Sequence, residues 1–205
     1  MDKKAMYRLT YGLFVITVRG EKDNGCIINT AIQAASDPNT VTVCLNKTDL
    51  THDILMKTGA FNISVLTEAA PFAIFRRFGY QSGRDADKFA DFTGMTRTAN
   101  GIYRLTDSVN AWIACKVRQT VDLGSHTMFI ADVTDMEAVS DEPSVTYAYY
   151  MDHIKPKPQE TEKKTGQVVW RCRICGYEYV GEELPDDFVC PICKHPASDF
   201  ERIVK

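Results

Sequence analysis

Two pairs of cysteines near the C-terminus constrain the fold of this chain more than any other feature of its sequence. They occur as Cys172-x-x-Cys175 and Cys190-x-x-Cys193 in the stretch RCRICGYEYVGEELPDDFVCPICKHPASDF. Each pair places two thiolates on one tight turn, and four thiolates make the tetrahedral sulfur site that suits zinc or iron. The cysteines lie in a segment of 38 residues, 168–205, which is too short to bury a sufficient hydrophobic core. The sequence therefore predicts a small domain held together by a metal ion.

The residues around the cysteines favour iron over zinc, because a dry aromatic shell tunes a redox potential more than it helps a structural ion. The module contains five aromatic residues: Trp170, Tyr177, Tyr179, Phe188 and Phe200. The stretches CRICGYEY and LPDDFVCPICKHPASDFE resemble rubredoxin, the one-iron electron carrier, over residues 169–203. The resemblance implies one iron per chain, bound as Fe(Cys)4 by Cys172, Cys175, Cys190 and Cys193.

One feature departs from the rubredoxin pattern. Only 14 residues separate Cys175 from Cys190, about half of the usual spacing, as in the short rubredoxin modules attached to other redox proteins. This shortening affects the packing of the middle loop and not the four ligands. A structural zinc ribbon stays the alternative, since it uses the same knuckle spacing.

A polar segment separates this module from the rest of the chain. Residues 155–167, KPKPQETEKKTGQ, contain two prolines, six charged residues and no large apolar side chain. Such a composition cannot bury a face, so it predicts a flexible linker. We therefore expect a first domain over residues 1–154, a linker over 155–167 and a short rubredoxin-like domain over 168–205.

The overall composition excludes several classes of function. The formal net charge is -3, which argues against nucleic-acid binding. No apolar run is long enough to span a bilayer, and the N-terminus lacks a secretory signal, so we expect a cytoplasmic protein without a membrane partner. In a reducing compartment, CxxC pairs act as ligands more often than as disulfides. The three isolated cysteines, Cys26, Cys44 and Cys115, are interpreted as buried hydrophobic residues.

Hydrophobic patterning predicts that the first domain is mainly β. Candidate strands cover residues 13–18, 41–45, 61–65, 113–123 and 127–133, and the last two form a hairpin across Gly124 and Ser125. In the third strand, Asn62 and Ser64 alternate with apolar residues, as in a half-buried strand. Many strands with few helices favour a closed or split β-barrel over a parallel sheet.

Two short helices interrupt the predicted strands. One covers residues 51–57 and stops at Gly59, and the other covers residues 68–78 with Thr67 as its cap and basic residues in its last turn. The sequence has neither GxGxxG nor GxxxxGK[ST], so it offers no Rossmann or P-loop nucleotide site.

The first domain resembles the flavin reductase-like FMN-binding split barrel. The resemblance is carried by residues 11–66, beginning YGLFVITVRGEKDNGCIINTAIQ, and by FGYQSGRDADKF, DLGSHTMFIADV and TYAYYM. It covers most of residues 5–152. A flavin reductase domain followed by a short rubredoxin resembles the fused proteins called high-molecular-weight rubredoxins, which by that resemblance pass electrons from NAD(P)H to flavodiiron oxygen or nitric-oxide reductases. It also implies a homodimer with FMN near the subunit interface.

Several residues are predicted to hold FMN. Asn29, Thr30 and Ala31 lie along the flavin by the resemblance, where backbone groups can reach the edge of the ring. The turn between a strand and a helix offers N–H groups, a hydroxyl and a cation to the phosphate, from Asn46, Lys47 and Thr51. Arg84 and Lys88 are proposed to clamp that phosphate, from the same chain or from a second subunit. The plain alternatives are a polar strand start, a helix cap formed by Asp49 or Thr51, and a solvated loop.

His126 is the candidate catalytic residue, placed near the reduced nicotinamide or the flavin. The family often shows Gly-Asp-His at this point, whereas this chain has Gly124-Ser125-His126, so no role is assigned to a carboxylate. Tyr149 and Tyr150 are expected either to cover the isoalloxazine ring or to close the barrel as an aromatic pair.

The sequence predicts an oxidoreductase that passes electrons from NAD(P)H through FMN to Fe(Cys)4 and on to an acceptor protein. Flavin converts a two-electron donor into one-electron steps, so no protein nucleophile is required. Two alternatives stay open: a flavin-binding protein whose zinc ribbon docks a partner, and a free-flavin or ferric reductase with an accessory rubredoxin.

Overall fold

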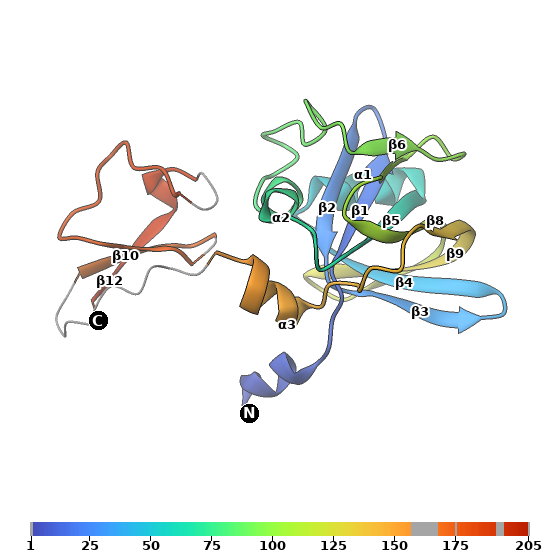
Figure 1. Cartoon of the computed structure of the whole chain (residues 1–205), viewed down its shortest axis with the longest axis horizontal. Coiled ribbons are helices and arrows are strands. Elements are labelled where there is room, and N and C mark those ends of the chain that lie inside the picture. The colour runs from blue at the N-terminus through green and yellow to red at the C-terminus, as the bar shows by residue number, and fades with distance from the viewer. Residues whose placement is uncertain (1, 157–167, 175, 192–194, 205) are drawn as a thin grey trace. The chain divides into compact units, whose positions relative to one another are not determined.

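The computed structural model describes residues 2–156, 168–174, 176–191 and 195–204, and the chain divides into two compact units (Figure 1). Residues 1–154 form the larger unit and residues 155–205 the smaller one. Of the predicted linker, residues 157–167 lie outside the described part. None of the helices in the described ranges has the length and apolar character required to cross a membrane.

The larger unit is built on one seven-stranded antiparallel sheet with the order β2-β1-β5-β8-β9-β4-β3. Its strands are β1 (Phe14–Arg19), β2 (Asp23–Ile28), β3 (Ala31–Ser36), β4 (Asn39–Asn46), β5 (Ala60–Leu66), β8 (Val109–Asp122) and β9 (His126–Ala138). The five predicted strands correspond to β1, β4, β5, β8 and β9, with small differences at their ends. The prediction of a mainly β fold is confirmed.

The sheet is buried on both faces of its central strands. Along β1, Ile16 and Val18 belong to a first core cluster that also draws residues from β2, β4, β5, β8, β9 and α1 (Leu50–Thr58), while Val15 belongs to a second cluster that packs against α2 (Phe72–Gly79). The prediction that β5 is half-buried was wrong, because Asn62 and Ser64 are 0% exposed.

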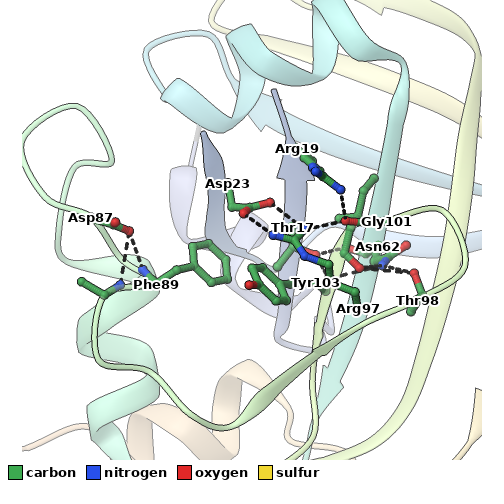
Figure 2. A network of polar contacts seen from close by, with 12 residues as sticks. Thr17, Arg19, Asp23, Asn62, Asp87, Phe89, Arg97, Thr98, Gly101 and Tyr103 are labelled. Atoms are coloured by element: carbon green, nitrogen blue, oxygen red, sulfur yellow. Dashed lines mark hydrogen bonds and ion pairs between the residues drawn. The ribbon is translucent and has the colours of Figure 1, made fainter. Parts of the chain in front are cut away.

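A small hairpin covers the polar face of β5, and we call it the β6–β7 hairpin after its strands β6 (Met95–Arg97) and β7 (Tyr103–Leu105). Figure 2 shows how Asn62 anchors it. The Asn62 amide donates to Thr98 Oγ1 at 2.9 Å and to the carbonyls of Ile102 and Tyr103 at 3.1 and 3.2 Å. Asn100 donates to Asn62 Oδ1 at 2.7 Å, so both ends of the buried amide are satisfied.

The outer side of the same hairpin is held by charge and by aromatic stacking. Arg97 pairs with Asp23 at 2.8 Å and lies 3.8 Å from the centre of the Tyr103 ring. Phe89 stacks on Tyr103 with 5.4 Å between ring centroids. The segment before β6 and the β6–β7 hairpin are therefore fixed to each other as well as to the sheet (Figure 2).

The helix predicted at residues 51–57 is confirmed as α1. It ends at Gly59, which adopts a φ of 67° that favours glycine and donates its N–H to Leu55 O at 2.9 Å. The helix predicted at residues 68–78 begins later, since α2 starts at Phe72 with Pro71 at its N-cap. Thr67 is not its cap: its hydroxyl is buried and has no hydrogen-bond partner within the described part of the chain.

Short helical turns lie at the two ends of the larger unit: η1 (Lys3–Arg8), α3 (Tyr147–Tyr149) and η2 (Tyr150–Ile154). The smaller unit contains a three-stranded antiparallel sheet in the order β11-β10-β12 and a short 3-10 turn. These elements are β10 (Val168–Cys172), β11 (Glu178–Val180), β12 (Phe200–Val204) and η3 (Ala197–Asp199).

Candidate functional site

The turn between β4 and α1, residues 46–49, brings several of the predicted FMN-binding residues together. Asn46 Oδ1 accepts hydrogen bonds from the N–H and the hydroxyl of Thr48, both at 3.1 Å, and the Asp49 N–H donates to Asn46 O. The Lys47 N–H donates to Ser125 O at 3.0 Å. The turn's own N–H groups are thus already paired, so free donors for an anion must come from the first turn of α1.

The start of β9 lies directly beside this turn. His126 is paired with Asn46 in the register of β9 and β4, so two residues that the sequence separates by 80 positions are strand neighbours. The Ser125 hydroxyl lies 2.9 Å from His126 Nδ1. The structure therefore brings the candidate catalytic residue to the predicted phosphate turn.

Lys47 already has an anionic partner here. Its ammonium lies 2.7 and 2.8 Å from the two carboxylate oxygens of Asp122, at the end of β8. Lys47 and the N–H of Gly124 hold the pKa of Asp122 below its ordinary value. Sequence reasoning missed Asp122 because it looked for an acid only next to His126; the acid in VDLGSH lies two residues before Gly124.

Arg84 reaches the same turn from the loop after α2. Its guanidinium donates to Asp53 Oδ2 at 2.7 Å and to Thr48 O at 3.3 Å. This ion pair lowers the pKa of Asp53. The loop lies close to β2, since a Cβ on Gly83 would lie 2.3 Å from Asn24 Oδ1, which only glycine tolerates.

Lys88, the other proposed phosphate cation, has a different set of partners. It is 4% exposed, and its ammonium donates to Gly25 O at 2.9 Å and to Phe78 O at 3.1 Å. Removal from water lowers its pKa. In this structure Lys88 fastens the loop to β2 and to the end of α2.

The remaining predicted flavin contacts lie at the same end of the sheet. Thr51, which is 1% exposed, accepts a hydrogen bond from Asn24 at 3.0 Å. The Thr30 hydroxyl donates to Cys44 O at 3.1 Å, and Cys44 lies two residues before Asn46 in β4. Asn29 precedes Thr30 between β2 and β3, Ala31 is the first residue of β3, and both are half-buried.

The two tyrosines predicted near the flavin, Tyr149 and Tyr150, have different surroundings. Tyr150 is 6% exposed, its ring lies 4.5 Å from that of Phe75, and its hydroxyl is 2.7 Å from that of Tyr80. Tyr150 is thus a core aromatic residue. Tyr149 is half-buried and stacks on His153 with 4.3 Å between centroids.

The candidate metal centre lies in the smaller unit. Cys172 and Cys190 are 1% and 0% exposed, while Cys175 and Cys193 lie outside the described residues. The Cys172 N–H donates to Tyr177 O and the Cys190 N–H to His195 O, both at 2.8 Å. Each of these two cysteines thus combines a hydrogen-bonded backbone N–H with a buried thiol, which fits a thiolate metal site.

Three other aromatic rings of the same unit pack around Phe188. Phe188 lies 4.8 Å from Tyr179, 5.4 Å from Phe200 and 6.5 Å from Tyr177 between ring centroids. Trp170 adds an indole N–H that is buried without a partner among the described residues. The two described cysteines are both buried, as the proposed tetrathiolate site requires.

Comparisons with known proteins match both parts of the chain. The profile of the flavin reductase like domain matches residues 6–157, and that of the rubrerythrin, rubredoxin-like domain matches residues 170–201. The chain is 36% identical to the high molecular weight rubredoxin of Moorella thermoacetica, over 99% of this chain and all of that protein. It is 35% identical to the ferric-chelate reductase (NAD(P)H) of Archaeoglobus fulgidus, over 73% of this chain and 89% of that one.

Solved structures show the same fold for the larger unit. The styrene monooxygenase flavin reductase of Pseudomonas putida S12 superposes with a TM-score of 0.59 at 26% identity, covering 70% of this chain and 90% of that one. BorF, the flavin reductase component of a bacterial two-component tryptophan halogenase, superposes with a TM-score of 0.62 at 21% identity, covering 71% and 93%.

Proposed function

The chain belongs to the flavin reductase-like family and carries a C-terminal rubredoxin-like domain, and from this premise we propose that it passes electrons from NAD(P)H through FMN to an Fe(Cys)4 centre and on to an acceptor protein. As an NAD(P)H-dependent flavin reductase it needs a flavin site, a nicotinamide site and an outlet for electrons. FMN, when bound, supplies the conversion of a hydride into single electrons.

The observation that carries the proposal is the meeting of Asn46, Lys47, Arg84 and His126 at the start of α1. Lys47 and Arg84 come from different elements and reach one turn. Their carboxylate partners are exposed, and exposed ion pairs contribute little free energy. Each cation can therefore exchange its carboxylate for a phosphate at small cost, and the first-turn N–H groups of α1 favour the same anion.

The remaining residues would orient the ring and the donor. Thr30 is held against β4, which keeps the backbone of Asn29 and Ala31 in place along the proposed edge of the flavin. His126 would hold the nicotinamide or the flavin through the ring nitrogen that Ser125 does not contact. Tyr149, on the surface of α3, is proposed as the aromatic cover.

In the smaller unit, Cys172, Cys175, Cys190 and Cys193 would bind one iron. Cys172 and Cys190 are buried, and Tyr179, Phe188 and Phe200 pack together in the same unit, which supports a redox role. A structural zinc ion would not benefit from such packing. We propose that residues 155–167 act as a flexible tether between residues 1–154 and 168–205.

The acceptor and the assembly state complete the proposal. The acceptor is proposed to be a flavodiiron oxygen or nitric-oxide reductase. A homodimer is supported by β3, an edge strand that is exposed along almost its whole length and carries Ile32 at 66% exposure. An exposed apolar edge strand is normally covered, and a second copy of the chain is a suitable cover.

A second candidate function is reduction of ferric chelates or of free flavin. Ferric-chelate reduction is favoured by the 35% identity of this chain to the ferric-chelate reductase (NAD(P)H) of Archaeoglobus fulgidus. In that case the rubredoxin-like domain would be accessory, and removing it would leave the full activity.

An anaerobic titration of the full-length protein with NADH or NADPH tests the proposal. The untreated protein is expected to show overlapping flavin and thiolate-to-iron bands, with one flavin and one iron per chain, and both are expected to bleach. If protein produced with ample iron contained one zinc ion per chain and no iron, the electron-transfer role would be wrong. Flavin that bleaches while the iron bands persist would favour the second candidate.

A further inference from the structure

His52, a buried residue of α1 to which the sequence assigns no role, connects the elements of the proposed flavin site. It is 8% exposed. Its Nδ1 lies 3.3 Å from Asp53 Oδ1, and its Nε2 lies 2.9 Å from Thr127 Oγ1. Asp53 is in turn paired with Arg84 at 2.7 Å. Arg84, Asp53, His52 and Thr127 thus form one polar chain across three elements.

Each end of this chain touches the proposed site. Thr127 directly follows His126 in β9, and consecutive strand residues point to opposite faces. Thr127 is 5% exposed and points toward α1, while His126 is half-buried and paired with Asn46. At the other end, Arg84 also donates to Thr48 O in the β4–α1 turn.

The directions of the hydrogen bonds follow from the charge on Asp53. The pairing with Arg84 lowers the pKa of this carboxyl, so it is an anion that only accepts. The proton must therefore lie on His52 Nδ1. In the neutral ring Nε2 then carries only a lone pair, and the Thr127 hydroxyl must donate to it. The T-shaped contact with the Phe129 ring, at 5.8 Å, holds the imidazole plane.

We propose that His52 is a positioning residue, oriented by Asp53, that fixes the Thr127 hydroxyl and thereby the start of β9, so that His126 keeps its place against the flavin site. The proposal rests on the function proposed above. It separates two tasks: Arg84 and the β4–α1 turn serve the phosphate, while the link from His52 to Thr127 serves the transfer of hydride.

Thr127 allows a matched pair of variants in the full-length protein. Thr127→Val keeps the shape and removes the hydroxyl, whereas Thr127→Ser keeps the hydroxyl and removes a methyl group. We expect Thr127→Val to slow flavin reduction at saturating NAD(P)H by about tenfold while the FMN dissociation constant stays within about twofold, since positioning errors act on the chemical step. Thr127→Ser is expected to keep at least half of the wild-type rate. A loss in Thr127→Ser with a normal rate in Thr127→Val would overturn the proposal in favour of simple packing.

A spectroscopic measurement tests the same link without any turnover. In protein labelled with nitrogen-15 at histidine, the resonances of His52 should report a proton on Nδ1, and Thr127→Val should move the Nε2 resonance of His52. His153, which is exposed in η2, is the internal control and should not move. A proton on Nε2 in the neutral ring, or no response to Thr127→Val, contradicts the proposal.

The outcomes distinguish this inference from the proposed function. If the wild-type protein bound no flavin, or if NAD(P)H failed to reduce the flavin, the proposed function would be wrong. The role of His52 in hydride transfer would then be wrong as well. The nitrogen resonances would still show whether the hydrogen bond between His52 and Thr127 exists. If the wild type is active and Thr127→Val equals it in rate, only the role of His52 is wrong. Asp53→Ala, changed at the half-exposed end, should give a partial loss of rate.

Discussion

Two cations of the proposed phosphate site already sit beside carboxylates, and this decides how single substitutions should act. Lys47 faces Asp122, and Arg84 faces Asp53. A bound phosphate must compete with these acids. Removing a cation therefore has two effects: it deletes an attraction and leaves an unpaired carboxylate near the phosphate.

We predict that Lys47→Ala weakens FMN binding by about ten- to a hundredfold, the range that corresponds to the loss of one charge-assisted hydrogen bond. Asp122→Asn should instead tighten FMN binding, because it removes the carboxylate that competes with the phosphate for Lys47. Lys57→Ala, at the exposed end of α1, is the control and should leave the affinity unchanged. Flavin fluorescence titration measures all three. Equal affinities in Lys47→Ala and Lys57→Ala would show that the phosphate binds elsewhere.

Burial controls the chemistry of the isolated cysteines. Cys26 and Cys115 are 6% and 1% exposed, as predicted, and loss of water raises the pKa of each thiol to about 12. Cys44 is only half-buried, which differs from the prediction. Between the ordinary value of 9.0 and about 12, the folded state holds a proton on Cys115 that the unfolded state has released. Stability contributed by this thiol is therefore present below pH 9 and is lost as the pH rises.

The expected consequence is a pH slope. The free energy of unfolding should fall by about 1.4 kcal/mol per pH unit for each such thiol in this window. Cys115→Ala should remove one such contribution from the slope, whatever its effect on stability at neutral pH. Urea unfolding of Cys115→Ala and of the wild-type protein at several pH values above 9 provides the measurement. An unchanged slope in Cys115→Ala would mean that the thiol is accessible to water.

At the level of elements, polar residues define features that hydrophobic patterning does not detect. The β6–β7 hairpin has no periodic apolar pattern, yet it covers β5 because Asn62 offers a full set of hydrogen bonds to it (Figure 2). A buried amide of this kind is costly to remove, because its partners stay buried without donors.

We predict that Asn62→Ala lowers the free energy of unfolding by about 2–4 kcal/mol, since several groups of the β6–β7 hairpin lose their partner in the interior. Asn39→Ala, which affects one exposed contact with Gln33, should change it by less than about 0.5 kcal/mol. Denaturant unfolding of both variants makes the comparison. A small effect in Asn62→Ala would indicate that water replaces the amide.

The elements also show where sequence reasoning succeeds and where it fails. The hairpin of β8 and β9 was predictable from alternating residues around Gly124, whose φ of 83° suits the turn. The start of α2 was predicted too early, although Pro71 contained the signal: a residue before proline avoids the helical region, which excludes Ala70. For β3, the sequence AIQAAS contains a single β-branched residue and no alternation of apolar and polar side chains, so no strand was predicted.

The candidate site depends on contacts that no local pattern records. Asn46 and Lys47 were predicted to bind the FMN phosphate, and His126 to lie near the nicotinamide or the flavin, but their meeting requires the register of β4 and β9. Lys88 was predicted to clamp the phosphate, with a solvated loop as the alternative, and the structure shows it buried against two carbonyls. The cysteine pairs, by contrast, are a local pattern, and the metal site that their spacing indicates stays a prediction.

At the scale of the whole molecule, the proposed tether makes a kinetic prediction. A linker of 13 residues raises the local concentration of the rubredoxin-like domain to about the millimolar range. Cutting the chain near Gln159, outside the described residues, should leave one part with flavin and its reduction by NAD(P)H and another part with iron. Iron reduction in the cut mixture should then depend on protein concentration at micromolar levels. Equal, concentration-independent rates before and after the cut would mean that the two parts stay docked.

The central claim is that electrons enter at the flavin and leave through the iron of the same chain. Anaerobic stopped-flow mixing of the full-length protein with excess NAD(P)H, at two protein concentrations, tests it most directly. We predict that flavin absorbance falls first and that the thiolate-to-iron bands follow at a rate independent of protein concentration, while Cys193→Ser shows the flavin phase with altered or absent iron bands. Iron bands that persist after complete flavin reduction, or that bleach before the flavin, would contradict the account.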